Sequence, residues 1–284
     1  MSQRKSAASK HHVVLIGCGK MGGAMLEGWI ADTNLDAHFS IIEPFQDHLG
    51  WTASHANIAL FDSCAASEAA SIPPATMIVL AVKPQMMDVA IGHFAHMIDD
   101  DTAFLSIAAG ITTAWLASRL DPVSGGAATI IRAMPNTPAA IGQGITVLYS
   151  GDATDAKRDL AAQLLMAIGQ VVMIDDESLM DAVTAVSGSG PAYVFLLAEV
   201  MTKAGIEAGL PDDLATQLAE ATVAGAGALI AASDDDPAVL RANVTSKGGT
   251  TAAALDVLMA DDGMAPLLSR AIAAAKARSI ALGS

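Results

Sequence analysis

Aromatic residues and cysteines are scarce in this sequence. Aromatics make up 4% of the 284 residues, so the 52% of hydrophobic residues is mostly aliphatic, and aliphatic side chains pack well in helices and parallel strands. The two cysteines, Cys18 and Cys64, lie far apart and form no CxxC pair. This spacing excludes a disulfide framework and a zinc ribbon, and it favours a reducing, cytoplasmic location.

Basic residues are also few, with 15 Lys and Arg against 30 Asp and Glu and a formal net charge of -15. Nucleic acids and anionic membrane surfaces bind basic patches, so we expect neither as a partner. The apolar run at 78–82 ends at Lys83 and Pro84, far short of the roughly 20 residues of a membrane span, and we expect no such span. Residues 1–12 lack the apolar centre of a secretory signal and predict a disordered tail.

The chain from residue 13 to 175 alternates short β-branched or apolar runs with helical stretches. This alternation is typical of βαβ units and predicts an α/β domain with a doubly wound, mostly parallel sheet. The expected strands are 13–16, 40–43, 77–82, 103–107, 129–134, 145–149 and 171–174. Ligands of such sheets bind at the carboxyl ends of the strands.

The chain after residue 175 changes character, because strand-like runs disappear and Ala-rich and Leu-rich stretches with helical spacing take over. The expected helices are 178–186, 190–208, 212–232, 237–243, 250–259 and 265–281. We therefore expect an all-helical second domain over 176–284. Helices so rich in small and apolar residues favour packing against a second copy, which predicts a homodimer.

A GxGxxG pattern, made by Gly17, Gly19 and Gly22, follows the first expected strand and opens an apolar helix. The first glycine permits a tight turn, the second lets a pyrophosphate approach the backbone, and the third lets helix and strand pack closely. Lys20 and Met21 lie in the same loop, at the helix start that attracts phosphates. These residues predict a bound nicotinamide dinucleotide; a purely structural glycine turn is the alternative.

Glu43 ends the second expected strand, and 43 minus 22 places it 21 positions after the last glycine. A spacing of about 20 is usual for the acidic residue that binds the ribose hydroxyls. A carboxylate repels a 2'-phosphate, and no arginine in 44–48 offsets it. Glu43 therefore favours NADH over NADPH, although a solvated carboxylate at a strand end fits the same position.

Two further segments follow expected strands at the edge where a dinucleotide binds. Val82, Lys83 and Pro84 end one strand, and we expect them to contact the cofactor; a solvated lysine before a proline turn is the alternative. Asn136 lies in a loop with a proline on either side, which restricts the backbone. We expect its amide to bind the nicotinamide carboxamide, and a stiff surface turn is the alternative.

Glycine-rich stretches interrupt the helical half at 187–193 and 244–251, and each precedes an expected helix. Backbone amides at a helix start bind anions. The second stretch offers small donors suited to a carboxylate: Ser246, Gly248, Gly249 and Thr251. An ordinary capped helix entry is the alternative for either stretch.

The sequence has no pattern typical of a metal site. His93 and His96 are three residues apart, but no carboxylate cluster accompanies them, so we expect solvated histidines and no metal. We expect Cys18, inside the glycine loop, to be an apolar filler rather than a redox-active thiol.

Five motifs in order resemble the pyrroline-5-carboxylate reductases along the chain from residue 13 onward. They are GxGxxG at 17–22, AVKPQ at 81–85, RAMPNTP at 132–138, SGSGPAY at 187–193 and VTSKGGTTAAALDVL at 244–258. The resemblance implies that NADH or NADPH reduces the C=N bond of 1-pyrroline-5-carboxylate to give L-proline, the last step of proline biosynthesis. It also implies a Rossmann domain, here 13–175, followed by a helical substrate-binding and dimerisation domain, with larger assemblies of dimers common.

The resemblance also assigns site residues. Those in the family's cofactor motifs are Gly17, Gly19, Gly22, Lys83 and Asn136, and those in its substrate loop are Ser246, Gly248, Gly249 and Thr251. We expect the loop to hold the substrate carboxylate and the Thr251 hydroxyl to bind the ring nitrogen, which makes Thr251 the expected catalytic residue. Lys247 and Met259 depart from the family pattern, but neither removes a donor from the loop.

Two other functions remain alternatives. A related dehydrogenase of hydroxy acids or other imines would use a helical lysine as proton donor, for which Lys203 is the candidate. A non-catalytic nucleotide sensor would keep the glycine loop and lose the donors at 246–251.

Overall fold

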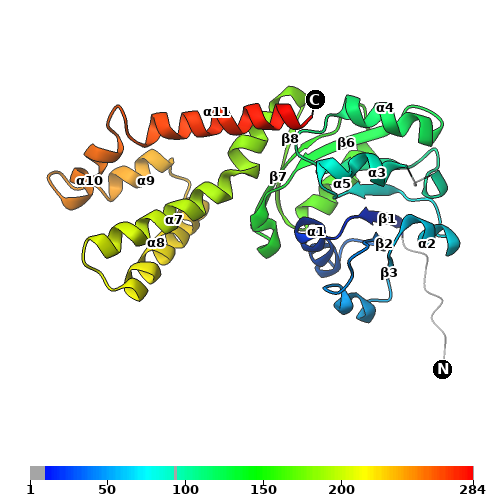
Figure 1. Cartoon of the computed structure of the whole chain (residues 1–284), viewed down its shortest axis with the longest axis horizontal. Coiled ribbons are helices and arrows are strands. Elements are labelled where there is room, and N and C mark those ends of the chain that lie inside the picture. The colour runs from blue at the N-terminus through cyan, green and yellow to red at the C-terminus, as the bar shows by residue number, and fades with distance from the viewer. Residues whose placement is uncertain (1–9, 93–94, 284) are drawn as a thin grey trace. The chain divides into compact units, whose positions relative to one another are not determined.

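The computed structural model describes residues 10–92 and 95–283, which form two compact units (Figure 1). The first unit holds the described residues up to Gly188 together with those from Lys276 onward, and the second is Ser189–Ala275. The first contains the sheet, and the second is helical.

The first unit is built on an 8-stranded sheet with the order β3-β2-β1-β4-β5-β6-β7-β8. Its strands are β1 (His11–Ile16), β2 (Ala37–Ile42), β3 (Ile58–Phe61), β4 (Met77–Leu80), β5 (Ala103–Ser106), β6 (Thr129–Met134), β7 (Gly144–Tyr149) and β8 (Gly169–Ile174). Neighbouring strands are parallel except β6 and β7, which are antiparallel. The expected strands and the mostly parallel sheet are confirmed. β3 was not expected.

Helices cover both faces of this sheet. The helical elements up to Gly188 are α1 (Lys20–Ala31), η1 (Gly50–Ser54), α2 (Cys64–Ala69), η2 (Pro84–Met86), α3 (Met87–Ile91), η3 (Ala95–Met97), α4 (Thr113–Ser124), η4 (Thr137–Ile141), α5 (Asp155–Met166), η5 (Glu177–Leu179), α6 (Met180–Val183) and the π-helical turn η6 (Thr184–Gly188). Alternate β1 residues face two different cores: Val13 packs in the one that contains Trp29 of α1, and Val14 in the one that contains Leu116 of α4. A sheet buried on both faces explains the near-continuous apolar strands.

The second unit consists of α7 (Gly190–Glu207), α8 (Asp212–Ala232), α9 (Pro237–Asn243), α10 (Thr250–Leu258) and most of α11 (Met264–Leu282). These helices match the expected ones closely, whereas the expected helix 178–186 is divided among η5, α6 and η6. The apolar side chains of the unit are largely exposed: Phe195 is 66% and Val257 72% exposed. One copy of the chain therefore does not bury the apolar surface of these helices.

Two helical stretches, Glu177–Glu207 and Asp212–Ala232, are long and apolar enough to cross a bilayer, each with a mean hydropathy of 1.3. Neither stretch contains a long uninterrupted apolar run, because small and polar residues are interspersed with the apolar ones. Length and composition alone do not separate a membrane span from a helix that packs against protein, so the expected absence of a span stays a prediction.

The ends of the expected domains differ from the compact units. β1 begins at His11, so the expected tail 1–12 extends too far; residues 1–9 lie outside the described part of the chain. The units divide after Gly188 and after Ala275, which places the stretch 176–188 and the end of α11 with the sheet. The division into functional domains at 175 stays a prediction.

Candidate cofactor and substrate sites

A cleft of about 370 Å³ opens at the carboxyl ends of β1, β4, β5 and β6. Its lining residues come from the ends of these strands, the loops and first helical turns that follow them, and η6: Gly19, Lys20, Met21, Ala81, Val82, Lys83, Pro84, Ile107, Ala108, Ala109, Met134, Pro135, Asn136, Thr137 and Gly188. The chain leaves β1 toward β2 on one side, and β4 pairs with β1 on the other. This is the switch point at which open parallel sheets bind ligands.

Each of the three glycines of the loop occupies a position with a different steric environment. Gly17 has a φ of +89°, and a Cβ there would meet Val82 Cγ1 at 2.9 Å. A Cβ at Gly22 would collide with the Gly17 carbonyl oxygen, so α1 packs against the loop only because residue 22 has no side chain. Gly19 lines the cleft, and a Cβ there would meet no atom within 4 Å. The loop therefore leaves open space beside Gly19, where a ligand can approach the backbone.

The start of α1 provides donors at this open space. Gly19 is the N-cap residue and makes no side-chain capping bond. The N–H groups of a first helical turn have no partner inside the helix, and the helix dipole attracts anions there. Lys20 and Met21 both line the cleft, and Lys20 is exposed. Backbone donors and one ammonium group thus fit a pyrophosphate.

Glu43 lies directly after β2 but does not line this cleft. Its carboxylate is buried, with the residue 8% exposed. Oε2 accepts the Cys18 N–H at 2.7 Å, and Oε1 accepts the Phe45 N–H at 2.9 Å. We expected the Glu43 carboxylate to be free to bind ribose, but both of its oxygens already accept backbone N–H groups. A carboxylate has about four acceptor positions, so its role toward the ribose hydroxyls stays a prediction.

The expected cofactor residues after β4 and β6 line the cleft, whereas Gly17 and Gly22 shape the loop without lining it. Val82, Lys83 and Pro84 follow β4, and the Lys83 side chain is exposed. Asn136 is 9% exposed, and its Oδ1 accepts the Ile145 N–H at 3.0 Å. This bond fixes the amide and leaves its NH₂ group as the available donor. The Asn136 side chain is thus held by β7, while its role toward the nicotinamide stays a prediction.

The expected substrate loop lies in the second unit, between α9 and α10. Gly248 has a φ of +71°, a conformation that favours glycine. The Gly249 N–H donates to the Ser246 carbonyl at 3.0 Å, so this amide, expected to hold a carboxylate, already has an acceptor. The donors that remain are the Gly248 N–H, the hydroxyls of Ser246 and Thr251, and the first-turn amides of α10, whose N-cap Gly249 forms no side-chain capping bond.

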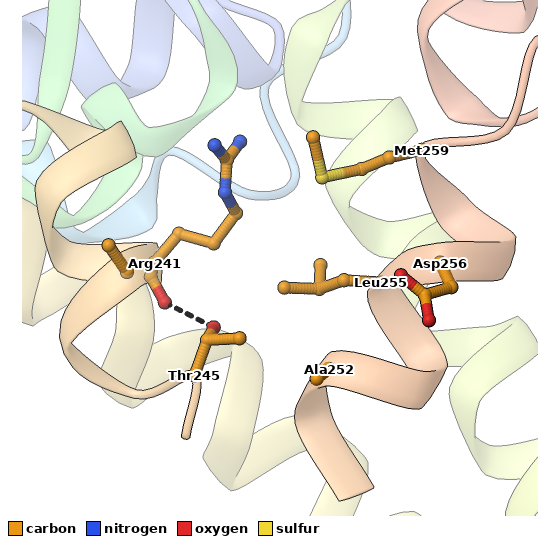
Figure 2. A pocket seen from close by; sticks show the side chains of 7 residues that line it. Arg241, Thr245, Ala252, Leu255, Asp256 and Met259 are labelled. Carbon is orange, nitrogen blue, oxygen red and sulfur yellow. Dashed lines mark hydrogen bonds between the residues drawn. The ribbon is translucent and has the colours of Figure 1, made fainter. Parts of the chain in front are cut away.

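A second pocket, of about 350 Å³, lies beside this loop and was not expected. Leu255 of α10 and Met259, the residue after α10, point toward α9, where the Arg241 side chain lies opposite them (Figure 2). The Thr245 hydroxyl donates to the Arg241 carbonyl at 2.6 Å. None of the four expected substrate residues lines this pocket. Arg241 belongs to no recognisable motif, so the sequence carries no signal for it.

The described residues contain no group of three or more His, Cys, Asp and Glu side chains that could hold a metal. His93 lies outside the described residues, and His96 Nε2 lies 3.0 Å from Ser67 Oγ. Burial, and to a smaller degree the Glu43 carboxylate, raises the pKa of the Cys18 thiol to about 12, so Cys18 is a packed apolar side chain. Lys203 is the candidate proton donor of the alternative dehydrogenase function. Its Nζ forms an ion pair with Glu199 Oε1 at 2.6 Å.

Two family models match the chain. Residues 177–282 match the pyrroline-5-carboxylate reductase dimerisation family, and residues 12–110 match the family described as NADP oxidoreductase, coenzyme F420-dependent. The first covers the helices with exposed apolar side chains. The second covers the glycine loop and the segment 82–84.

The similarity to known proteins extends along nearly the whole chain. The pyrroline-5-carboxylate reductase of Pseudomonas aeruginosa is 37% identical over 96% of this chain and 97% of its own, and that of Arabidopsis thaliana is 34% identical over 95% of each. A solved pyrroline-5-carboxylate reductase from Coxiella burnetii has a TM-score of 0.84 at 29% identity and covers 98% of this chain and 100% of its own. The Plasmodium falciparum enzyme, solved with NADP bound, has a TM-score of 0.77 at 26% identity over 98% of this chain and 100% of its own. The chain therefore belongs to the pyrroline-5-carboxylate reductase family.

Proposed function

We propose that this protein reduces the C=N bond of 1-pyrroline-5-carboxylate to give L-proline, the last step of proline biosynthesis, with NADH or NADPH as reductant. It is an oxidoreductase that acts on an imine. The observation that carries this proposal is the cleft at the switch point, where the glycine loop leaves open space beside Gly19. The end-to-end similarity to pyrroline-5-carboxylate reductases supports the choice of substrate.

The cofactor binds along the first unit's cleft in this proposal. The pyrophosphate lies at Gly19 and the first turn of α1, with Lys20 and Lys83 as nearby cations and Gly17 and Gly22 shaping the loop. The other cofactor contacts we propose are Met21, Glu43, Val82, Pro84 and Asn136. The bound dinucleotide supplies the hydride. The chain orients it, and the held amide of Asn136 donates from NH₂ to the nicotinamide carboxamide.

The preference between the two cofactors follows from Glu43 in this proposal. Its buried carboxylate bonds the loop, and its remaining acceptor positions suit the two ribose hydroxyls of NADH. A 2'-phosphate at the same place meets a like charge, so we propose that NADH is preferred.

The substrate carboxylate binds at the loop 246–251, held by the Ser246 hydroxyl, the Gly248 amide and the start of α10 at Gly249. The Thr251 hydroxyl bonds the ring nitrogen as the nitrogen gains amine character. A protonated cyclic imine is already electrophilic, so the protein needs neither a metal nor a nucleophile. Its main contribution is to hold the reacting carbon in position.

The exposed apolar helices of the second unit pack against a second copy of the chain in this proposal, giving a homodimer, and dimers combine into larger assemblies. The same contact accounts for the apolar stretches Glu177–Glu207 and Asp212–Ala232 without a membrane. We propose a cytoplasmic location and functional domains at 13–175 and 176–284, with the helical domain binding substrate.

The test is oxidation of NADH and NADPH by the purified protein with 1-pyrroline-5-carboxylate, compared with NAD⁺ reduction by hydroxy acids. We expect cofactor oxidation that depends on the imine, formation of proline and no reaction with hydroxy acids. Turnover of hydroxy acids alone would assign the related dehydrogenase activity. Cofactor binding without turnover of either substrate would assign a nucleotide sensor.

A further inference from the structure

The two peptide groups on either side of Cys18 are each held by a side chain from the segment after β2. The Cys18 N–H donates to Glu43 Oε2 at 2.7 Å, and His48 Nε2 lies 2.8 Å from the Cys18 carbonyl oxygen. Gln46 Nε2 in turn donates to the Glu43 carbonyl at 3.0 Å. Residues 43–48 therefore contact the glycine loop at its centre, between Gly17 and Gly19.

The bond from His48 has a defined direction. A carbonyl oxygen only accepts hydrogen bonds, so His48 Nε2 carries the hydrogen and donates it. Both the neutral Nε2–H tautomer and the imidazolium ion can donate this bond. Sequence patterns gave no reason to select His48, because it belongs to none of the five motifs.

The Cys18 carbonyl shares a planar peptide group with the Gly19 N–H. In a trans peptide these two groups point in opposite directions. Fixing the carbonyl toward His48 therefore fixes the Gly19 N–H on the opposite side. Gly19 lines the cleft, and its N–H has no hydrogen-bond partner in the part of the chain that the structure describes.

We propose that His48 is a positioning residue for the cofactor: it holds the Cys18–Gly19 peptide so that the Gly19 N–H faces the pyrophosphate. The inference rests on the proposed binding of NAD(P)H at the glycine loop. His48 acts through the peptide and touches neither substrate nor cofactor. Glu43 performs the same task on the preceding peptide, in addition to any contact with ribose.

The pyrophosphate is common to NADH, NADPH and ADP-ribose, so a loop-positioning role predicts equal effects on all three. A direct contact between His48 and a 2'-phosphate predicts an effect on NADPH alone. This difference makes the two roles separable by measurement.

The test uses the full-length protein with His48→Ala, His48→Gln and, as a control, Asp47→Asn, which alters an exposed neighbour. Dissociation constants for ADP-ribose, NADH and NADPH are measured by calorimetry, and kcat and KM by cofactor oxidation. We expect His48→Ala to weaken all three ligands by about three- to tenfold, the range of one hydrogen bond, with kcat changed less than about twofold. His48→Gln, whose amide also donates, restores binding, and Asp47→Asn has no effect.

Other results overturn the proposal. Weaker binding of NADPH alone assigns His48 to the 2'-phosphate. Unchanged ligand binding with a lower melting temperature assigns a purely structural role, and a lower kcat with unchanged binding assigns a role in the reaction. Because ADP-ribose binding needs no turnover, this outcome is independent of whether the protein reduces 1-pyrroline-5-carboxylate.

Discussion

The Arg132 guanidinium donates from Nη1 to Glu177 Oε1 at 2.9 Å, with the two side chains 5% and 21% exposed. Glu177 also accepts from the Thr113 N–H at 2.8 Å and from the Thr113 hydroxyl at 2.6 Å. One carboxylate thus joins β6, the start of α4 and the stretch that leads through η6 to Gly188. Gly188, which lines the cofactor cleft, lies 11 residues after Glu177 on this stretch.

Replacement of Glu177 by Ala leaves the Arg132 charge buried without its carboxylate partner. Breaking one side of a buried ion pair costs about 3 kcal/mol or more, so we expect the free energy of unfolding of the first unit to fall by roughly that amount. All 3 tryptophans of the chain lie in this unit, so tryptophan fluorescence during urea unfolding reports it. Asp175→Ala removes an exposed carboxylate two residues away and serves as the control; an equal loss in both variants would contradict the role of the pair.

The end of the chain packs closely against Gly110, which lies in the loop after β5. It has a φ of +79°, and a Cβ there would meet the Ser279 carbonyl oxygen at 2.7 Å and Leu282 Cβ at 2.9 Å. Gly125 has a φ of +73° with no atom within 4 Å of an added Cβ. Both Gly→Ala variants carry the strain of a positive φ, about 1 kcal/mol, but only Gly110→Ala also collides with α11.

We expect Gly110→Ala to lower the unfolding free energy by about 1 to 3 kcal/mol more than Gly125→Ala does, the usual cost of overpacking. The displaced C-terminal residues should also become sensitive to carboxypeptidase in Gly110→Ala alone. Equal stability and equal protease resistance of the two variants would show that the C-terminal turn does not depend on this contact.

Much of the fold was predictable from local sequence. Helices 212–232 and 237–243 and strand 129–134 were predicted to the residue, because strong apolar periodicity and prolines mark their ends. The π-helical turn η6 was not predicted, since the stretch 184–188 has ordinary helical spacing and its hydrogen-bond pattern depends on tertiary contacts. β7 was predicted as a strand, but its antiparallel pairing with β6 was not predicted. The direction of a strand depends on the path of the chain that leads into it, here through η4.

The candidate site was predictable where a motif carries the chemistry and unpredictable where a distant contact does. The spacing of Glu43 from the glycine loop predicted its place, yet not that both oxygens accept backbone N–H groups. His48 bonds a residue 30 positions away, which no local pattern shows. The Gly249 amide was expected to be free, and only the turn geometry reveals its bond to Ser246.

Acid should destabilise the protein through the amino-terminal end of the sheet. His12 Nδ1 lies 3.2 Å from the Pro74 carbonyl and Nε2 2.9 Å from Ser40 Oγ, with the His38 ring nearby. Burial, opposed in part by the Pro74 carbonyl, lowers the pKa of His12 from 6.5, and burial likewise lowers that of His11. The unfolded chain thus binds more protons than the folded one just below this pH.

Stability contributed by neutral His12 is therefore fully present above about pH 6.5 and is lost as the pH falls from there through the lower folded pKa. We expect a declining unfolding free energy between pH 7.5 and 5, measured by urea unfolding at fixed ionic strength. His12→Gln keeps an uncharged polar side chain and should flatten this decline, while the same change at the half-buried His55 should not. An unchanged slope in His12→Gln would assign the acid sensitivity to other groups.

Thr251 is the residue on which the proposed reaction depends most directly. Thr251→Val keeps the shape of the side chain and removes the hydroxyl that bonds the ring nitrogen, so we expect kcat/KM for 1-pyrroline-5-carboxylate to fall by about tenfold. The dissociation constant of NADH should stay within about twofold of its original value, because the cofactor's proposed contacts lie in the first unit. Thr250→Val is the matched control, since Thr250 is the exposed neighbour in the same turn of α10. Steady-state kinetics and calorimetry on the original protein and the two variants distinguish the roles. Intact turnover in Thr251→Val, or an equal loss of turnover in Thr250→Val, would show that Thr251 has no part in the catalytic step. The start of α10 would then serve only to bind the substrate.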